Sequence, residues 1–132
     1  DGYFRLTQHK NREIKPVRLE IWIHPELQRI IDATPTSGDT LLENQFGKPF
    51  TANGFGNRFK KWCREAGLPE RCSVHGLRKA GATRLANSGA SDHDIMAVTG
   101  HTTVKQLHGY TREADRKLGA ERALKRLGSE QD

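Results

Sequence analysis

The pattern of hydrophobic and polar side chains predicts two short strands near the start of the chain, at residues 3–8 and 17–23. In the second stretch the apolar residues from Val17 to Ile23 take every other position, a period that is typical of a half-buried β-strand. The polar residues 9–12 between the stretches predict a turn with Lys10 at or near its tip. We therefore expect the two strands to pair as an antiparallel hairpin.

After this hairpin, apolar residues recur at helical spacing. Pro25 suits the first position of a helix, and the apolar residues after it predict a short amphipathic helix near residues 25–31. Phe55, Phe59 and Trp62 lie four and three positions apart, which predicts a longer helix from residue 51 to a stop at Gly67. Between these two helices, residues 41 and 42 are expected to add a short third strand.

The second half of the chain predicts further helices. Ser73 is a candidate cap for a helix that closes at Gly89. Ser91 and Asp94 form a capping-box pattern for a short helix that ends at Gly100. Another short helix is expected to open at residue 102, followed by a highly charged last helix at residues 113–127. One side of that last helix is expected to carry its apolar residues, Ala114, Leu118, Leu124 and Leu127.

These elements predict an α+β fold that is mainly α-helical, with a small antiparallel β-sheet near the N-terminus packed on a helical core. The length of 132 residues suits one domain, and such a chain can bury about two thirds of its unfolded surface without a disulfide or a metal. No secretory pattern is evident, so Cys63 and Cys72 are expected to be reduced thiols. No apolar run approaches the length of a membrane span. We therefore expect a cytoplasmic protein.

The charge of the chain and its first residues add two expectations. A formal net charge of +6 at pH 7 favours a polyanionic partner such as nucleic acid. Met96 is the only methionine, so Asp1 is not a translation start, and Asp1-Gly2 is a typical hairpin turn that would need a strand before it. We therefore expect residues 1–132 to be the C-terminal piece of a longer protein.

A spaced set of polar residues suggests a reaction at a phosphate: His75, Arg78, His101 and Tyr110. The set offers a permanently charged cation, two imidazoles and a phenol. These groups can hold a phosphodiester, attack it with a side-chain oxygen and stabilise the charge that develops. His75 and Arg78 lie three positions apart, so on a helix their Cβ atoms would be about 5–6 Å apart on one face.

His101 and Tyr110 are separated by nine positions, which is about 13 Å along a straight helix and too far for one phosphate. Turns at Gly100 and Gly109 are therefore expected to bring the imidazole and the phenol together. Lys10, at the hairpin tip, is a candidate mobile ammonium that could protonate the leaving oxygen.

Other chemistries are less well supported. The sequence has no phosphate-cradling G-x-x-x-x-G-K-[ST] motif, and Gly54-Phe55-Gly56 lies in a helical pattern that does not match a dinucleotide-binding fingerprint. Cys63, Cys72 and His75 resemble part of a zinc site that lacks a fourth ligand at a suitable spacing. The predicted helices within residues 91–110 are spaced like those of a DNA-binding helix-turn-helix. That alternative would not account for Arg78 and Tyr110 together.

Three spaced motifs resemble the C-terminal catalytic domain of the tyrosine recombinase, or phage integrase, family: His75-Gly76-Leu77-Arg78-Lys79, Thr99-Gly100-His101 and Tyr110-Thr111-Arg112. The resemblance extends over about residues 3–127 and includes Thr7-Gln8-His9-Lys10 and the turn Gly47-Lys48-Pro49-Phe50. It implies a mostly helical fold and DNA strand exchange through a covalent 3′-phosphotyrosyl intermediate, with no metal or nucleotide cofactor. The implied partners are double-stranded DNA and other recombinase protomers, which the C-terminal helix is a candidate to contact.

The resemblance implies catalytic roles for five residues, each at the position that matches the family's motif. Tyr110 would be the nucleophile and Arg78 a clamp on the phosphate. His75 would assist proton transfer and phosphate binding, His101 would donate a hydrogen bond to the phosphate, and Lys10 would be the general acid. Neighbouring basic residues are candidate contacts to backbone phosphates of DNA: Lys79, Arg84, Lys105, Arg58, Lys60 and Lys61.

One part of the family pattern is missing. The family uses two clamp arginines, and the first lies on a helix before the strand hairpin, a place that no residue of this sequence occupies. The N-terminal core-binding domain is absent as well. Because loss of one such donor costs about 10²–10³ in rate, we expect this chain alone to be inactive or nearly so, and a longer parent to be active. The alternative is a non-catalytic DNA-binding remnant of a truncated mobile-element integrase.

Overall fold

The structure is a computed structural model that describes residues 2–8 and 13–129. The chain forms two compact units. The described residues of Tyr3–Ile21 and Leu77–Asp132 make up the first unit, and Trp22–Gly76 with Gly2 make up the second. Lys10 and the rest of the expected hairpin turn lie outside the described residues.

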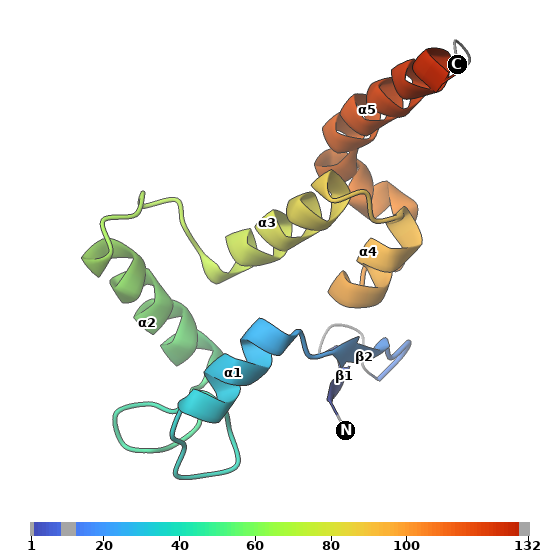
Figure 1. Ribbon diagram of the computed structural model, residues 1–132. Coiled ribbons are helices and arrows are strands. Elements are labelled where there is room, and N and C mark those ends of the chain that lie inside the picture. Colours follow the sequence, from blue (N-terminus) through green and yellow to red (C-terminus); the bar gives the residue numbers. More distant parts are fainter. Residues whose placement is uncertain (1, 9–12, 130–132) are drawn as a thin grey trace. The chain divides into compact units, whose positions relative to one another are not determined.

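The described part of the chain is mainly helical, which confirms the predicted fold class (Figure 1). None of its helices is both long enough and apolar enough to cross a bilayer. The elements, in chain order, are β1 (Tyr3–Thr7), β2 (Arg18–Trp22), α1 (Pro25–Ala33), α2 (Ala52–Glu65), α3 (Val74–Asn87), α4 (Asp92–Thr99) and α5 (Val104–Ser129).

Strands β1 and β2 pair in a two-stranded sheet, as the alternating pattern predicted. The N–H of Gln8 donates to the carbonyl oxygen of Val17 at 2.9 Å, which sets the register beyond the end of β1. Leu19 is the buried residue of β2, between exposed Arg18 and Glu20. The period of two therefore separates one apolar face of the strand from a charged one.

The core of the first unit is small and is built by the three helices α3, α4 and α5. Its buried members are Ala82 and Ala86 of α3, Ile95 of α4, and Leu107 and Ala114 of α5. Figure 1 shows α4 beside the first turns of α5, where Leu107 lies.

Helix α4 begins and ends where its sequence signals predicted. The side chain of Ser91 accepts from the Asp94 backbone N–H at 3.2 Å, and the Asp94 carboxylate accepts from the Ser91 N–H at 3.0 Å. Hydrogen bonds with the Ser91 side chain and then with its backbone lower the pKa of Asp94. Gly100 ends the helix in the left-handed conformation, with φ of 74°. The short helix is thus closed by local hydrogen bonds at both ends.

The second unit contains α1 and α2. Thr51 caps α2 by accepting from the Gly54 N–H at 3.0 Å. Phe55 contacts both Phe59 and Trp62, with ring centroids 6.2 Å and 6.5 Å apart, so the predicted aromatic face of this helix is confirmed.

The predicted third strand is wrong. Leu41 and Leu42 are exposed and lie in a bend, and the nearest strand-like pairing is an isolated bridge between Glu43 and Pro49. The Glu43 carboxylate accepts hydrogen bonds from the backbone N–H and the hydroxyl of Ser37. These bonds fold the segment into a loop, and no strand among the described residues pairs with residues 41 and 42.

Helix α5 corrects two further expectations. It runs unbroken from Val104 to Ser129, so there is neither a separate short helix nor a turn at Gly109. Its apolar residues also lie on different sides: Ala114 is buried, whereas Leu124 and Leu127 are exposed. At about 3.6 residues per turn, these leucines lie roughly 80° and 140° around the helix from Ala114. The apolar residues of the last turns therefore do not extend the core of the first unit.

Thr111 supplies a stability prediction. Its side chain is buried, and its hydroxyl has no hydrogen-bond partner among the described residues. Because Val keeps the shape and removes the unpaired polar atom, we expect Thr111→Val to raise the free energy of unfolding by about 1 kcal/mol in urea titrations. The control is Thr83→Val, since the Thr83 hydroxyl donates to the Lys79 carbonyl at 3.0 Å. If Thr111→Val lowered the free energy of unfolding by as much as the control does, the prediction would be contradicted.

Candidate active site

His101 and Tyr110 lie close together in the first unit. Their ring centroids are 6.1 Å apart and the rings are tilted by 50°. His101 follows the end of α4, and Tyr110 is in the second turn of α5. The turn between α4 and α5 is therefore sufficient to bring the imidazole and the phenol together, without the predicted turn at Gly109.

The end of β1 is attached to the same place through Gln8. The side-chain amide of Gln8 donates to the carbonyl oxygen of Thr99 at 3.1 Å. Its nitrogen passes so near Gly100 that a Cβ added there would lie 2.0 Å from it. Gly100 thus serves both as a left-handed helix end and as the point where the side chain that follows β1 reaches the backbone.

Gly100→Ala is expected to destabilise the chain by about 2–3 kcal/mol in urea unfolding. The cost combines the left-handed backbone with displacement of the Gln8 amide. Gly89→Ala is the matched control, because Gly89 also has a positive φ, of 88°, but an added Cβ would meet nothing within 4 Å. Equal decreases in the free energy of unfolding in the two variants would show that the Gln8 contact does not contribute to stability.

The side chain of Thr99 makes two close contacts at this site. Its Oγ1 donates to the carbonyl oxygen of Ile95 at 2.8 Å and lies 2.6 Å from Nδ1 of His101. The backbone N–H of His101 approaches the same oxygen at 3.5 Å. His101 is half-buried, so its ring orientation is set by the last turn of α4.

His75 and Arg78 lie on the first turns of α3, and both are exposed. Ser73 accepts from the Gly76 N–H at 3.2 Å, which confirms the predicted start of this helix. Arg78 belongs to the first unit and His75 to the second. In the part of the chain that the structure describes, Arg78 makes no hydrogen bond or ion pair with His101 or Tyr110. Of the five expected catalytic residues, the structure therefore brings His101 and Tyr110 together, and Lys10 lies outside the described residues.

The second unit has a polar recess of about 440 Å³ between the first half of α2 and the start of α3. It brings together two of the expected site residues, Lys60 and His75. An ammonium, an imidazole, two amides and a hydroxyl around one recess are donors suited to an anion. The sequence analysis did not predict the two amides, Asn53 and Asn57, or the hydroxyl of Ser73. Asn53, Asn57 and Lys60 are spaced four and three positions apart, which places them on one face of α2 and could have indicated the recess.

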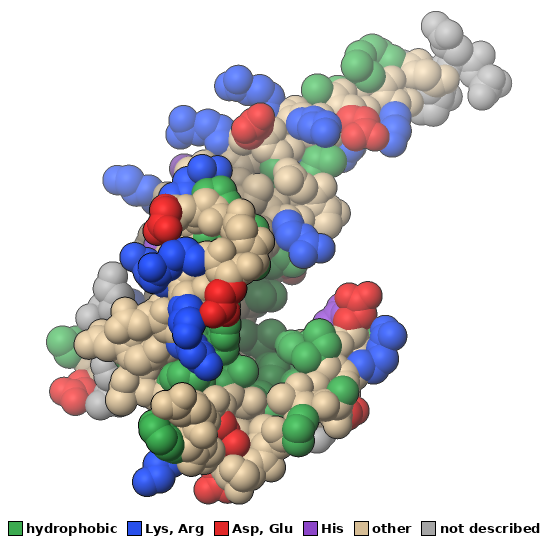
Figure 2. Space-filling view, turned by 90° about the vertical axis from the view of Figure 1, so that its left-hand side faces the viewer, with side chains coloured by type: hydrophobic (Ala, Val, Ile, Leu, Met, Phe, Trp, Pro, Cys, Tyr) green, Lys and Arg blue, Asp and Glu red, His purple; other side chains and the backbone are tan. Residues whose placement is uncertain are grey.

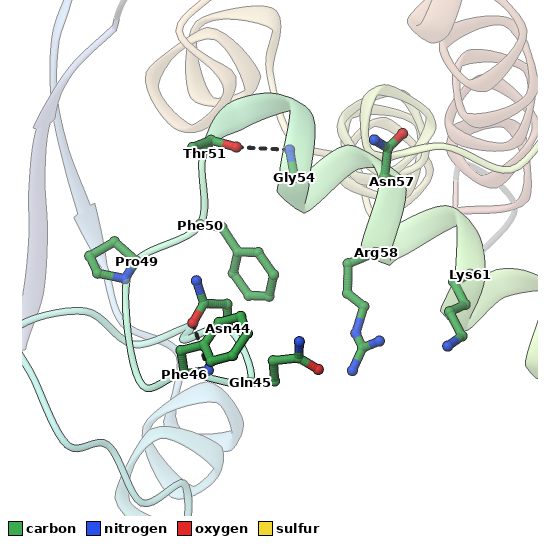
Figure 3. Close-up of a pocket in the computed structure, with 10 residues that line it drawn as sticks. All are labelled: Asn44, Gln45, Phe46, Pro49, Phe50, Thr51, Gly54, Asn57, Arg58 and Lys61. Atoms are coloured by element: carbon green, nitrogen blue, oxygen red, sulfur yellow. Dashed lines mark hydrogen bonds between the residues drawn. The ribbon is translucent and has the colours of Figure 1, made fainter.

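Arg58 and Lys61 line a different cavity of about 420 Å³ in the second unit. Figure 3 shows both side chains extending from α2 toward the loop that carries Gln45 and Phe46. The Arg58 guanidinium carbon also lies 5.7 Å from the ring centroid of Trp62, and this cation–π contact orients the charge. These two cations therefore face a partly aromatic wall, unlike Lys60.

The other expected DNA contacts are exposed: Lys79 and Arg84 on α3, and Lys105 on α5. Figure 2 shows one face on which Lys and Arg side chains extend into solvent with Asp and Glu side chains between them. Among the described residues, no group of three or more His, Cys, Asp or Glu side chains could hold a metal ion.

The comparison with protein families decides what these residues belong to. The model of the phage integrase family matches residues 1–117. The chain belongs to the phage integrase family. This match includes the Arg78, His101 and Tyr110 motifs and confirms the resemblance that the sequence suggested.

Several curated members of the phage integrase family resemble the chain in sequence. Tyrosine recombinase XerC of Listeria monocytogenes serotype 4b is 31% identical over 87 residues, which cover 66% of this chain and 29% of that protein. Tyrosine recombinase XerD of Pseudomonas putida is 35% identical over 80 residues, which cover 61% of this chain and 27% of that protein. The matched part of the chain thus spans less than a third of the length of these relatives.

Solved structures share the fold of this family member. The XerA recombinase superposes with a TM-score of 0.71 at 17% identity, over 92% of this chain and 45% of that one. The integrase of transposon Tn1549, solved in complex with a circular intermediate DNA, gives a TM-score of 0.64 at 18% identity, over 91% and 47%. At these identities the likeness concerns the fold, and it agrees with the mainly helical arrangement described above.

Proposed function

We propose that the chain is the C-terminal catalytic part of a site-specific DNA recombinase or integrase that breaks and rejoins double-stranded DNA through a covalent 3′-phosphotyrosyl intermediate. The observation that carries this proposal is the pairing of His101 with Tyr110, with ring centroids 6.1 Å apart, in a member of the phage integrase family. The names of the curated relatives support recombination as the reaction, and the DNA bound by the Tn1549 integrase supports DNA as the substrate.

In the proposed reaction, the phenol oxygen of Tyr110 attacks the phosphorus of a phosphodiester. A P–O bond to the tyrosine forms, and the bond to the 5′ oxygen of the next nucleotide breaks. Arg78 would hold the non-bridging oxygens with its planar fork, and His101 would donate to one of them. Lys10 would give a proton to the leaving 5′ oxygen, and His75 would assist proton transfer and phosphate binding. Attack by a 5′ hydroxyl on the phosphotyrosine reverses these steps and rejoins DNA.

The recess around Lys60 and His75 is proposed as a contact to the DNA backbone. A phosphate placed there would meet one full positive charge and several neutral donors. Lys79, Arg84, Lys105, Arg58 and Lys61 would supply further contacts from the exposed surface. Contacts of this kind release counterions, so they are measurable as salt dependence.

We expect Lys60→Gln to reduce the slope of log affinity against log salt concentration by about 1 for double-stranded DNA. Fluorescence anisotropy with the 132-residue chain measures this slope. Lys125→Gln is the matched control, since Lys125 lies on the last turns of α5 and pairs with Glu121 at 2.6 Å. An unchanged slope in Lys60→Gln, or an equal change in the control, would show that the recess does not contact DNA.

The exposed apolar residues at the end of α5 are proposed to contact another protomer on DNA. Leu124 and Leu127 are 68% and 61% exposed, so the first unit leaves them available. In Figure 2, hydrophobic side chains lie on the surface of this helix near the grey terminal residues. The sequence analysis expected Ala114 to belong to the same contact surface as these leucines. Ala114 is instead buried in the core of the first unit, so the proposed contact consists of Leu124 and Leu127.

The experiment that tests the proposed function is capture of the covalent intermediate. A suicide DNA substrate, nicked so that the cleaved strand is lost, should yield a protein–DNA adduct with the intact recombinase that contains these residues. Peptide mapping should place the DNA on Tyr110. The isolated chain should form little or no adduct, because it has one of the two clamp arginines of the family. DNA binding by the intact protein without any adduct would favour the non-catalytic remnant.

A further inference from the structure

The hydroxyl of Thr99 has a single proton and more than one neighbour. The carbonyl oxygen of Ile95, at 2.8 Å, has no proton to give and can only accept. The backbone N–H of His101 can only donate. The ring atom Nδ1 of His101, at 2.6 Å, could take either role, depending on where the imidazole carries its proton.

The short contact to Ile95 settles that choice. If the hydroxyl proton pointed to Nδ1, two oxygen atoms carrying negative partial charge would face each other at 2.8 Å with no proton between them. With the proton on the Ile95 carbonyl, as is common for threonine in a helix, Oγ1 presents a lone pair to His101. The 2.6 Å contact is then a hydrogen bond only if Nδ1 carries a proton.

We infer that Thr99 is a positioning residue that keeps the proton of neutral His101 on Nδ1, so that Nε2 is the ring atom able to accept a proton. In neutral imidazole one nitrogen donates and the other accepts, and the hydrogen bond at one atom selects the tautomer. Thr99 acts from the last residue of α4, and Gly100 between the two residues lets the chain turn back for this contact.

This inference rests on the proposed function for its role in the reaction. Tyr110 must lose its phenol proton as the P–O bond forms, and the His101 ring is its neighbour. Transfer of that proton to Nε2 makes an imidazolium that holds two donors. Nδ1–H stays on the Thr99 hydroxyl oxygen, and Nε2–H becomes available to donate to a phosphate oxygen. One residue thereby acts first as base and then as the hydrogen-bond donor that the family pattern implies.

Nitrogen NMR of the 132-residue chain tests the positioning directly. Histidine labelled with ¹⁵N reports which ring nitrogen is protonated, and the His101→Gln variant identifies the signals of His101. Spectra are recorded at rising pH until the ring shifts stop changing, so that the neutral form is observed. The expected result is Nδ1–H in the wild type, a shift toward Nε2–H in Thr99→Val, and return of Nδ1–H in Thr99→Ser.

Thr102→Val is the matched control, because Thr102 is exposed and lies one residue after His101. Nε2–H in the wild type would overturn the inference, as would an unchanged tautomer in a folded Thr99→Val variant. Should Thr99→Val fail to give a folded amide spectrum, the wild type and Thr99→Ser decide, since loss of Nδ1–H in either contradicts the role of the hydroxyl.

The second measurement is the rate of adduct formation by the intact recombinase on a suicide substrate. We expect Thr99→Val to lower this rate by about 10²-fold with little change in DNA affinity, and Thr99→Ser to restore it. A wild-type rate in a variant whose tautomer has shifted would overturn the role as base. Absence of any adduct with the wild type would instead remove the proposed function, and the NMR result distinguishes that case because it requires no DNA.

Discussion

Tyr110→Phe in the intact recombinase is expected to abolish the covalent protein–DNA adduct. The substitution removes one oxygen atom and leaves the ring, so the contact with His101 at a centroid distance of 6.1 Å should persist. Without the phenol oxygen no bond to phosphorus can form, whereas DNA affinity should change little. The measurement is adduct formation on a suicide substrate, analysed by denaturing gel electrophoresis, with DNA affinity determined in parallel.

The chain offers a well-matched control for this experiment. Tyr3 is its only other tyrosine and lies on β1 with 46% of its surface exposed. Tyr3→Phe should form adduct at the wild-type rate. Adduct formation by Tyr110→Phe would refute the assignment of the nucleophile, and loss of adduct in both variants would point to a structural effect.

Arg78→Lys is expected to lower the rate of adduct formation by about 10²–10³-fold, the usual cost of removing one preorganised donor to a developing charge. Lysine keeps the positive charge but loses the planar pair of donors that can hold two phosphate oxygens together. Because the Arg78 side chain is exposed, the free energy of unfolding should be nearly unchanged. The measurement is single-turnover cleavage at saturating protein, together with urea unfolding.

Arg29→Lys serves as the control for Arg78→Lys. Arg29 is an exposed arginine on α1 in the second unit, and no catalytic role is proposed for it. A cleavage rate in Arg78→Lys within a factor of about two of this control would contradict a clamp at residue 78. A large loss of stability in Arg78→Lys would instead indicate a structural role.

The start and end of α4 show where local reasoning succeeds. Ser91, Asp94 and Gly100 lie within ten residues, and the hydrogen bonds that close the helix join neighbours in the sequence. The aromatic face of α2 is similar, because residues three and four positions apart meet on any helix. Such features follow from spacing, so the sequence was enough to predict them.

Helix α5 shows where the same reasoning fails. Gly109 was expected to interrupt it, since glycine costs about 1 kcal/mol in a helix interior. Burial of Leu107 and Ala114 against α3 and α4 holds the helix through this position instead. The expected strand at residues 41 and 42 failed for a related reason, since hydrogen bonds from Ser37 to Glu43 determine the conformation of that loop.

By itself, the sequence was enough to indicate the family and the mainly helical fold class, and to name candidate side chains for the chemistry. Motif spacing and helix caps are properties of the chain that require no knowledge of what lies across the core. The tertiary structure alone decided that His101 meets Tyr110 without a turn at Gly109, that Gln8 packs against Gly100, and that Lys60 shares a recess with His75. These contacts join residues on different elements, and their distances depend on how side chains pack, which spacing along one chain does not specify.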